Sequence, residues 1–308
     1  MAGSGKPVGG GAGAAGQTIG EAVTSLARAL RAEGLESAEQ DARLLVVAAA
    51  GVSREVLLRA PETALTPTAA RTLAEFAARR CAQEPVSRIL GVRGFYGREF
   101  RVSRATLDPR PETETVVDAA LEVAAGEAWL ARPLRIVDVG TGTGCLLLTL
   151  LAELPEATGV GTDISPDALH VAAGNAARLR LERRVSFERR RSLEPQRGER
   201  ADTFDLLVSN PPYIPTGDIA ALEAGVRNFD PHLALDGGSD GLEIYRQIAA
   251  RLIEAVPDGW SLLEVGAGQS EDVANLIRKA VPTHRVREMR SWLDLAGHTR
   301  CVAVRTQM

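Results

Sequence analysis

Apolar positions in the N-terminal part of the chain recur at the spacing of an amphipathic helix. Between residues 18 and 84 they fall three or four residues apart, as Leu26 and Leu30 do, and this spacing places them on one face of a helix. The segments Thr18–Glu21 and Ser37–Gln40 both have the form of a capping box, which marks the start of a helix. We therefore predict a small all-helical domain over residues 18–84.

After Arg132 the pattern changes to short apolar runs that alternate with helical segments, which is typical of a parallel sheet covered by helices on both faces. The runs predict strands at residues 134–140, 158–164, 184–190, 204–210 and 259–266. The segments between them predict helices at residues 145–154, 166–179, 242–256 and 271–280. Two further β-type runs, 284–292 and 299–306, are joined around Gly297 and predict an antiparallel pair at the sheet edge. The expected fold class is α/β, with a Rossmann-like, mostly parallel sheet of seven strands.

The two predicted domains are joined by a segment of different character. Residues 85–106 contain β-type runs around a glycine-punctuated middle, which predicts a hairpin linker. Residues 107–114, LDPRPETE, follow with prolines directly before a helix begins. Residues 1–17 are rich in Gly and Ala, lack the apolar core of a signal peptide and are expected to form a flexible tail. The expected boundaries are thus 1–17, 18–84, 85–106 and 107–308.

The composition of the 308 residues argues against several classes of function. A formal net charge of -4 does not suit a protein that binds nucleic acid through its bulk charge. Cys81, Cys145 and Cys301 are odd in number and far apart, so no disulfide framework is expected and a reducing cytoplasm fits. No histidine pairs with a cysteine at metal spacing, and no apolar run reaches the roughly 18 residues of a membrane span. We therefore expect neither a bound metal nor a membrane anchor.

Glycines follow the first predicted strand of the sheet. In VDVGTGTGC, Gly140, Gly142 and Gly144 come directly after the apolar run, and such a turn lets the backbone approach a ligand at the carboxyl end of the strand. The next strand ends in Asp163, an acid placed to accept both hydroxyls of a ribose. Ser165 is available to cap the following helix, so Asp163 is not needed for that purpose. Together these residues predict a cofactor that contains a nucleoside.

The strand at residues 204–210 ends in Asn-Pro-Pro-Tyr, which continues no regular structure. The prolines fix the backbone and remove competing N–H donors, and Asn210 adds a side-chain carbonyl. Two rigid acceptor oxygens bind both hydrogens of a planar –NH2 group and favour a pyramidal nitrogen whose lone pair points at an electrophile. We predict that this pocket holds an –NH2 group for attack on a methyl sulfonium.

The motifs in this order resemble those of the release factor glutamine methyltransferases, the HemK/PrmC family. The resemblance rests on LDPRPETE, VDVGTGTGC, TDISPDAL, FDLLVSNPPYIP, GLEIYRQI and EVGAGQ, from about Pro85 to the C-terminus. It implies a class I methyltransferase sheet and S-adenosyl-L-methionine as cofactor. The implied reaction is methyl transfer to the side-chain amide nitrogen of the glutamine in the Gly-Gly-Gln motif of peptide chain release factors, which tunes translation termination.

The family's cofactor residues carry over to this chain by motif. The resemblance implies that Asp163 binds the ribose, that Arg110 and Thr113 flank the cofactor, and that Asn210 borders it. The methionine part of the cofactor would contact the glycine turn, which comprises Gly140, Thr141, Gly142, Thr143 and Gly144.

The substrate residues carry over in the same way. Asn210, Pro211, Pro212 and Tyr213 would hold the glutamine amide, with the tyrosine ring against the flat group. The chain departs from the family at RRSLEP, where an acid and an aromatic residue usually stand beside the adenine. Ser192 and Leu193 are expected there instead, with Leu193 covering the adenine without stacking on it.

Two other functions fit part of this pattern. An amino-methyltransferase acting on adenine in DNA or RNA uses the same tetrapeptide, but it should carry a basic target-recognition region, and this chain is acidic overall. A non-catalytic cofactor-binding scaffold is argued against by the intact Asn-Pro-Pro-Tyr. We expect a monomeric cytoplasmic enzyme with release factors as partners and no direct nucleic-acid binding. The helical domain over residues 18–84 either recognises the protein substrate or only caps the fold.

Overall fold

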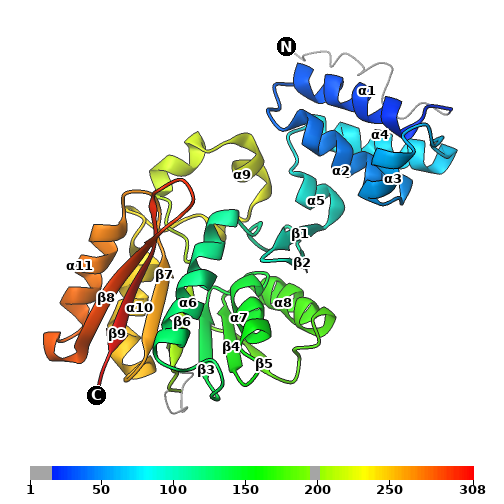
Figure 1. Cartoon of the computed structure of the whole chain (residues 1–308). Coiled ribbons are helices and arrows are strands. Elements are labelled where there is room, and N and C mark those ends of the chain that lie inside the picture. Colours follow the sequence, from blue (N-terminus) through cyan, green and yellow to red (C-terminus); the bar gives the residue numbers. More distant parts are fainter. Residues whose placement is uncertain (1–15, 195–201) are drawn as a thin grey trace. The chain divides into compact units, whose positions relative to one another are not determined.

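The structure is a computed structural model that describes residues 16–194 and 202–308. The chain forms two units, one ending at Gly91 and the other beginning at Val92, and each is described by itself (Figure 1). The flexible tail expected at the N-terminus lies outside the described residues up to residue 15.

The first unit is helical throughout its described residues, as predicted. Apolar side chains of four helices contribute to its core, and Leu26, Leu30, Leu45 and Leu73 are all fully buried there. The helices are α1 (Ile19–Ala32), α2 (Ala38–Ala50), α3 (Arg54–Arg59), α4 (Pro67–Cys81) and α5 (Val86–Leu90).

One of the two predicted capping boxes forms. At the start of α1, the Thr18 hydroxyl accepts the Glu21 N–H at 3.2 Å and the Glu21 carboxylate accepts the Thr18 N–H at 2.9 Å. The prediction for α2 is wrong, because the Ser37 hydroxyl caps no backbone N–H. It donates instead to the Asp41 carboxylate at 2.8 Å, a charged acceptor one turn along the helix.

A two-stranded antiparallel hairpin opens the second unit. Strand β1 (Val92–Phe95) pairs with β2 (Arg98–Arg101), and Phe95 lies opposite Arg98 across the turn. Phe95 and Phe100 are 2% and 0% exposed and belong to the main core of this unit. Of the segment predicted as a linker, residues 86–90 thus form helix α5, and the hairpin itself is packed into the second unit.

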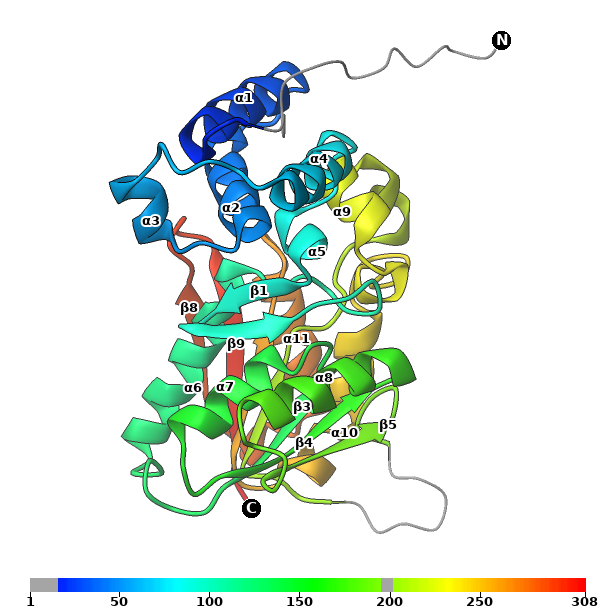
Figure 2. The same cartoon turned by 90° about the vertical axis from the view of Figure 1, so that its right-hand side faces the viewer.

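Asn175 fastens this hairpin to the rest of the unit. It lies on α8 (Pro166–Arg178) and is 1% exposed. Its Oδ1 accepts the Arg101 N–H at 2.8 Å, while its Nδ2 donates to the carbonyls of Arg101 and Thr143 at 3.1 and 2.9 Å. The two views show the hairpin beside α8 (Figures 1 and 2). One buried amide therefore joins β2 to the glycine turn.

The second unit is built on a seven-stranded sheet, as predicted. Its strand order is β5-β4-β3-β6-β7-β9-β8; the first five run parallel, and β9 pairs antiparallel with both β7 and β8. The strands are β3 (Arg135–Val139), β4 (Thr158–Asp163), β5 (Val185–Arg189), β6 (Leu206–Ser209), β7 (Trp260–Glu264), β8 (Val286–Leu293) and β9 (Thr299–Thr306).

Helices cover both faces of this sheet because its strands are apolar on both faces. Ile136 and Leu262 pack into one core cluster, and their neighbours Val137 and Leu263 pack into the other, as alternation along a strand requires. Helices α6, α7 and α8 cover the first face, and α10 and α11 cover the second (Figure 1). The bounds are α6 (Glu114–Gly126), α7 (Cys145–Glu153), α10 (Glu243–Ala255) and α11 (Ser270–Ala280).

The strand order reverses between β3 and β6, which places a ligand crevice at their carboxyl ends. Ser209, at the end of β6, donates its hydroxyl proton to the Val139 carbonyl at 2.6 Å and ties the two strand ends together. The segment between β6 and α10 lies at the same edge and contains helix α9 (Ala224–Phe229). The fold therefore brings the glycine turn after β3 and the Asn-Pro-Pro-Tyr segment after β6 side by side.

Candidate active site

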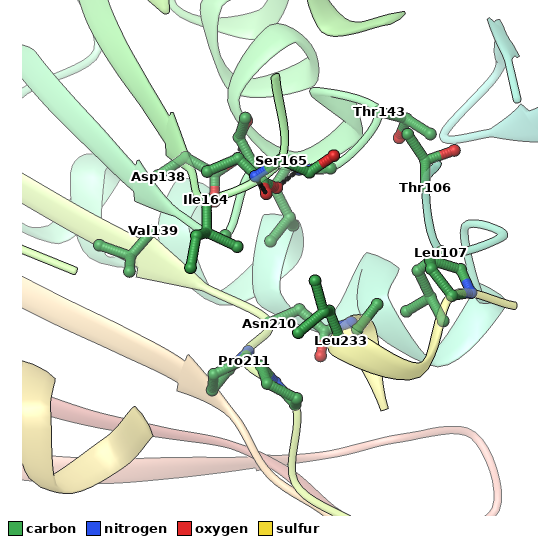
Figure 3. Close-up of a pocket in the computed structure, with 18 of the residues that line it drawn as sticks. Thr106, Leu107, Asp138, Val139, Thr143, Ile164, Ser165, Asn210, Pro211 and Leu233 are labelled. Atoms are coloured by element: carbon green, nitrogen blue, oxygen red, sulfur yellow. Dashed lines mark hydrogen bonds between the residues drawn. The ribbon is translucent and has the colours of Figure 1, made fainter. Parts of the chain in front are cut away.

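A cavity of about 270 Å³ opens at this reversal of strand order. Its walls come from the ends of β3, β4 and β6, from the segment 105–113 before α6, and from residues 231–236. Figure 3 shows Asn210 and Pro211 on one side of it, with Ile164 and Leu233 also facing the space. The predicted site residues that line it are Arg110, Thr113, Gly140, Thr141, Gly142, Thr143, Asp163, Asn210, Pro211 and Pro212.

The glycine turn has a backbone that other residues adopt only with strain. Gly140, Gly142 and Gly144 have φ values of +73°, +55° and +80°, in the left-handed region that favours glycine. Gly144 does not line the cavity, because it faces α7, where a Cβ would lie 2.9 Å from Leu148 Cδ1. The turn is fixed at its start by the N–H groups of Gly140 and Thr141, which both donate to the Thr162 carbonyl.

Asp163 holds the turn and the following helix at once. Its Oδ2 accepts the Gly142 N–H at 3.0 Å, and its Oδ1 accepts the Ser165 N–H at 2.9 Å. Burial raises the pKa of this carboxyl, and the bonds from Ser165 and Gly142 oppose the rise. Ser165 caps α8 as predicted, accepting the Ala168 N–H at 3.2 Å. Each carboxylate oxygen retains a lone pair for a hydroxyl donor.

Asp138 is a site residue that the sequence argument missed. It is 1% exposed and lies on β3 beneath the glycine turn, where its Oδ2 accepts the Thr141 hydroxyl at 2.7 Å. Its Oδ1 is buried and has no partner among the described residues, although the residue lines the cavity. Burial raises the pKa of this carboxyl to about 7. The sequence did contain an indication of this residue, which is an acid inside the apolar run IVDV. A carboxylate buried in a strand needs a partner, and a ligand can supply one.

Asn210 is the first residue after β6, and its amide is oriented by a hydrogen bond. Its Nδ2 donates to the Thr113 hydroxyl oxygen at 3.1 Å, across 97 residues of chain. Thr113 is 2% exposed and precedes α6, so a rigid part of the fold holds this contact. With the nitrogen committed to Thr113, Oδ1 is the part of the Asn210 amide left to accept a hydrogen bond, and the residue lines the cavity.

Tyr213 lies behind the cavity wall. It does not line the cavity, and its side chain packs against the core cluster formed with α10 and α11. Its carbonyl accepts the Gln269 Nε2–H at 2.9 Å, and its ring would come within 3.0 Å of a Cβ on Gly266. Burial raises the pKa of the Tyr213 hydroxyl to about 12, so it stays neutral near pH 7.

Arg110 links the cavity wall to the segment after α9. Its guanidinium lies 2.6 Å from the carboxylate of Asp230, whose side chain is 1% exposed. The next residues, Pro231 and Leu233, line the cavity, and Leu233 is 66% exposed. The ion pair thus positions an apolar wall that sequence patterns did not reveal.

The expectation that Leu193 lies beside the cofactor is corrected by its position. Leu193 lines a separate cavity of about 20 Å³ with Val160 and Phe204 and packs against the core. Burial against apolar side chains is favourable for an aliphatic residue. Ile164, directly after Asp163 and 37% exposed, is one of the apolar side chains that line the main cavity.

Two further observations concern the described part of the chain. It contains no group of three or more His, Cys, Asp or Glu side chains that could hold a metal ion. None of its helices is both long enough and apolar enough to cross a membrane.

The sheet, the glycine turn, the acid at the end of β4 and the Asn-Pro-Pro-Tyr segment define an S-adenosylmethionine-dependent methyltransferase. Two family models match: "PrmC N-terminal domain" over residues 21–91 and "Methyltransferase domain" over residues 131–249. The release factor glutamine methyltransferase of Bradyrhizobium diazoefficiens is 46% identical, with 94% of this chain and 95% of the relative covered. The release factor glutamine methyltransferase of Rhodospirillum rubrum is 45% identical, and the match covers 90% of this chain and 81% of the relative. The chain belongs to the release factor glutamine methyltransferase family, which confirms the resemblance in the motifs.

Solved structures add information on the fold. The hMettl16 catalytic domain, in complex with MAT2A 3'UTR hairpin 6, superimposes with a TM-score of 0.51. The match covers 78% of this chain and 81% of that one at 16% identity. A likeness at this level of identity concerns the methyltransferase fold alone.

Proposed function

We propose that this protein transfers a methyl group from S-adenosyl-L-methionine to the side-chain amide nitrogen of the glutamine in the Gly-Gly-Gln motif of peptide chain release factors. The observation that carries the proposal is the Asn210 amide, which lines the cavity and whose Nδ2 donates to the Thr113 hydroxyl oxygen at 3.1 Å. An acceptor held in this way suits an –NH2 group, the part of the glutamine that reacts. The relatives that match most of the chain are named for this activity.

The residues around the cavity fit the proposed cofactor, which supplies a methyl group on a positively charged sulfur. Asp138 offers an unpartnered buried carboxylate oxygen, which suits the ammonium group of the methionine part. The N-terminal part of the glycine turn lets the backbone approach the same part closely. Asp163 would accept the ribose hydroxyls, and Ile164 would give the adenine an apolar surface.

The chemical step follows from two acceptors. Asn210 Oδ1 and the Pro211 carbonyl would accept the two N–H protons of the glutamine amide and so weaken the conjugation of its nitrogen lone pair. The nitrogen would then take the methyl group that the cofactor supplies, and the demethylated thioether would be the leaving group. The nitrogen would lose one proton to solvent and end as an N-methyl amide. No strong base is required, because the nitrogen becomes acidic as it is methylated, and Tyr213 remains neutral behind the wall.

The helical unit is the proposed recognition element for the release factor. Its core is self-contained, and the described residues that line the cavity all belong to the second unit. A separate helical body can therefore bind a protein substrate without altering the chemistry. That the enzyme is a cytoplasmic monomer and does not bind nucleic acid directly stays a prediction.

Mass analysis of the Gly-Gly-Gln peptide tests the proposal. Purified release factor, incubated with the protein and cofactor, should gain one methyl group on the motif glutamine. Asn210→Ala serves as the matched control and should leave the peptide unmodified over the same time. Methylation of adenine in DNA or RNA, with an unmodified release factor, would contradict the proposal.

A further inference from the structure

Residues 230–236 form a wall of the cavity to which the chemical step assigns no role. Pro231 and Leu233 both line the cavity from this wall. Leu233 nevertheless stays 66% exposed, which places it at the mouth of the cavity rather than in its depth. Its side chain points into the space that Asn210 and Pro211 border (Figure 3). A substrate group held at Asn210 therefore shares the cavity with Leu233.

The start of this wall is fastened to the segment before α6. The carboxylate of Asp230, whose side chain is 1% exposed, lies 2.6 Å from Arg110 Nη2. Its other oxygen accepts the Asp108 N–H at 3.4 Å. Leu107, in the same segment as Arg110, also lines the cavity. The ion pair thus joins, at the cavity, two segments that lie 120 positions apart in the sequence.

The end of the wall is fastened to the Asn-Pro-Pro-Tyr segment. Ile214, the residue after that tetrapeptide, donates its N–H to the Leu235 carbonyl at 3.1 Å and accepts the Gly237 N–H at 2.9 Å. The two segments are so close that a Cβ on Gly237 would lie 2.8 Å from the Pro212 carbonyl oxygen. The wall is therefore held in place relative to the residues that would bind the substrate amide.

Between these two attachments, Leu233 lies in a short 3₁₀ helix, η3 (His232–Ala234). The Ala234 N–H donates to the Pro231 carbonyl at 2.9 Å, and the Leu235 N–H donates to the His232 carbonyl at 3.0 Å. Leu235 is 5% exposed, and the ring of Pro231 fixes its own φ angle. The backbone that carries Leu233 is therefore rigid, and a group that meets this side chain cannot push the wall aside.

We propose that Leu233 is a specificity-determining residue that lies against the substrate residue before the reactive glutamine and favours glycine there. The inference rests on the function proposed above, in which the glutamine amide is held at Asn210. A glutamine side chain is short, so the substrate backbone lies at the mouth of the cavity when the amide reaches Asn210. The residues without side chains precede the glutamine in Gly-Gly-Gln, and they suit the place where Leu233 is fixed.

Leu233 acts through packing, and Asp230 is a positioning residue that holds the wall. A Cβ on the substrate residue before the glutamine would need the space that Leu233 occupies. One added methyl group at such a packed contact lowers kcat/KM by about tenfold or more. Covering the exposed leucine with a glycine backbone removes apolar surface from water and favours the correct substrate. The wall therefore selects the motif, while Asn210 and Pro211 address the reacting amide.

Steady-state methylation of two release factors by the full chain tests this reasoning. One has the native motif, and in the other the glycine before the glutamine is replaced by alanine. Wild type should prefer the native motif by at least about tenfold in kcat/KM. Leu233→Ala should reduce the preference to less than about threefold, whereas Leu233→Met, which keeps the volume, should retain it. Asp230→Asn should also weaken the preference, because the wall loses its ion pair.

The comparison of the two substrates isolates the contact at Leu233. Any strain that the alanine causes within the release factor is the same for every enzyme variant, so a change in the preference reports the contact itself. Leu130→Ala is the matched control and should keep the wild-type preference. Leu130 is 50% exposed, precedes the amino end of β3 and does not line the cavity.

Cofactor affinity and melting temperature separate this role from others. In Leu233→Ala the affinity for S-adenosylmethionine should change less than about twofold, and the melting temperature should stay close to that of wild type. An unchanged preference in Leu233→Ala would overturn the proposal, as would a wild type that methylates both release factors equally well. If wild type methylates neither release factor, or Asn210→Ala is as fast as wild type on the native motif, the proposed function fails instead.

Discussion

Asp138 should make cofactor binding depend on pH in a specific direction. Burial raises the pKa of its carboxyl to about 7, so in the free protein it is largely protonated below that pH. A cationic ammonium group at the unpartnered Oδ1 favours the ionised form and lowers the pKa again. Affinity for S-adenosylmethionine is then present above pH 7 and is lost as pH falls below it.

The magnitude follows from the ionised fraction. If only ionised Asp138 binds, the dissociation constant should fall about fifteenfold from pH 5.5 to pH 7 for a group with pKa near 7. This window lies below the ordinary pKa of an α-amino group, about 7.7–8.0, so the ligand keeps its charge. At pH 6, binding should also release about nine-tenths of a proton.

Isothermal titration calorimetry in two buffers with different ionisation heats measures both quantities. Asp138→Asn should bind more weakly at pH 7 and lose the slope, whereas Glu264→Gln should keep the slope, since Glu264 lies outside the cavity. A flat wild-type profile would refute the reasoning. A slope that persists in Asp138→Asn would assign the titration to another group, such as Asp163, whose pKa burial also raises.

Three further predictions address the other parts of the site. Asp163→Ala should weaken cofactor binding by about 1.5–3 kcal/mol, because a charge-assisted acceptor is lost; unchanged affinity in calorimetry would remove Asp163 from the ribose site. Asn210→Ala should lower single-turnover methylation by about 10²–10³ with little effect on cofactor affinity, by analogy with the loss of an oxyanion-hole donor; a wild-type rate would place the reaction elsewhere. The fragment 92–308 should bind the cofactor like the whole chain but methylate folded release factor more slowly, and equal rates would reduce the helical unit to a cap.

The parts of the fold that the sequence predicted are those set by local patterns. Apolar runs such as Leu206–Ser209 form buried strands, and glycines such as Gly140 stand where φ is positive. The position of Asp163 beside the cavity could be predicted because the residue ends strand β4. The end of a parallel strand fixes both where the side chain lies and which way it points. The antiparallel pair after Thr283 followed from two runs and a short glycine loop.

The parts that could not be predicted depend on contacts across the sheet. The bond between Thr113 and Asn210 joins residues 97 positions apart, and no spacing encodes it. The unpartnered oxygen of Asp138 follows from burial, which is a property of the assembled fold. The Leu193 side chain packs against the core rather than beside the cofactor site. A local motif does not indicate that this core lies close to the residue. The side chain of Ser37 was also not predictable from the local motif. Its hydroxyl bonds to the nearby Asp41 carboxylate rather than to a backbone N–H at the start of the helix.

The way the hairpin is anchored decides where members of this family can exchange domains. A catalytic fragment that begins at residue 107 would strip Phe95 and Phe100 from the core and leave the Asn175 amide without its partners on Arg101. A junction at Gly91 keeps all of these intact and cuts between the two units. Chimeras that carry a foreign helical domain should therefore inherit the hairpin from the catalytic parent, so that the helical unit is exchanged without disturbing the core of the second unit.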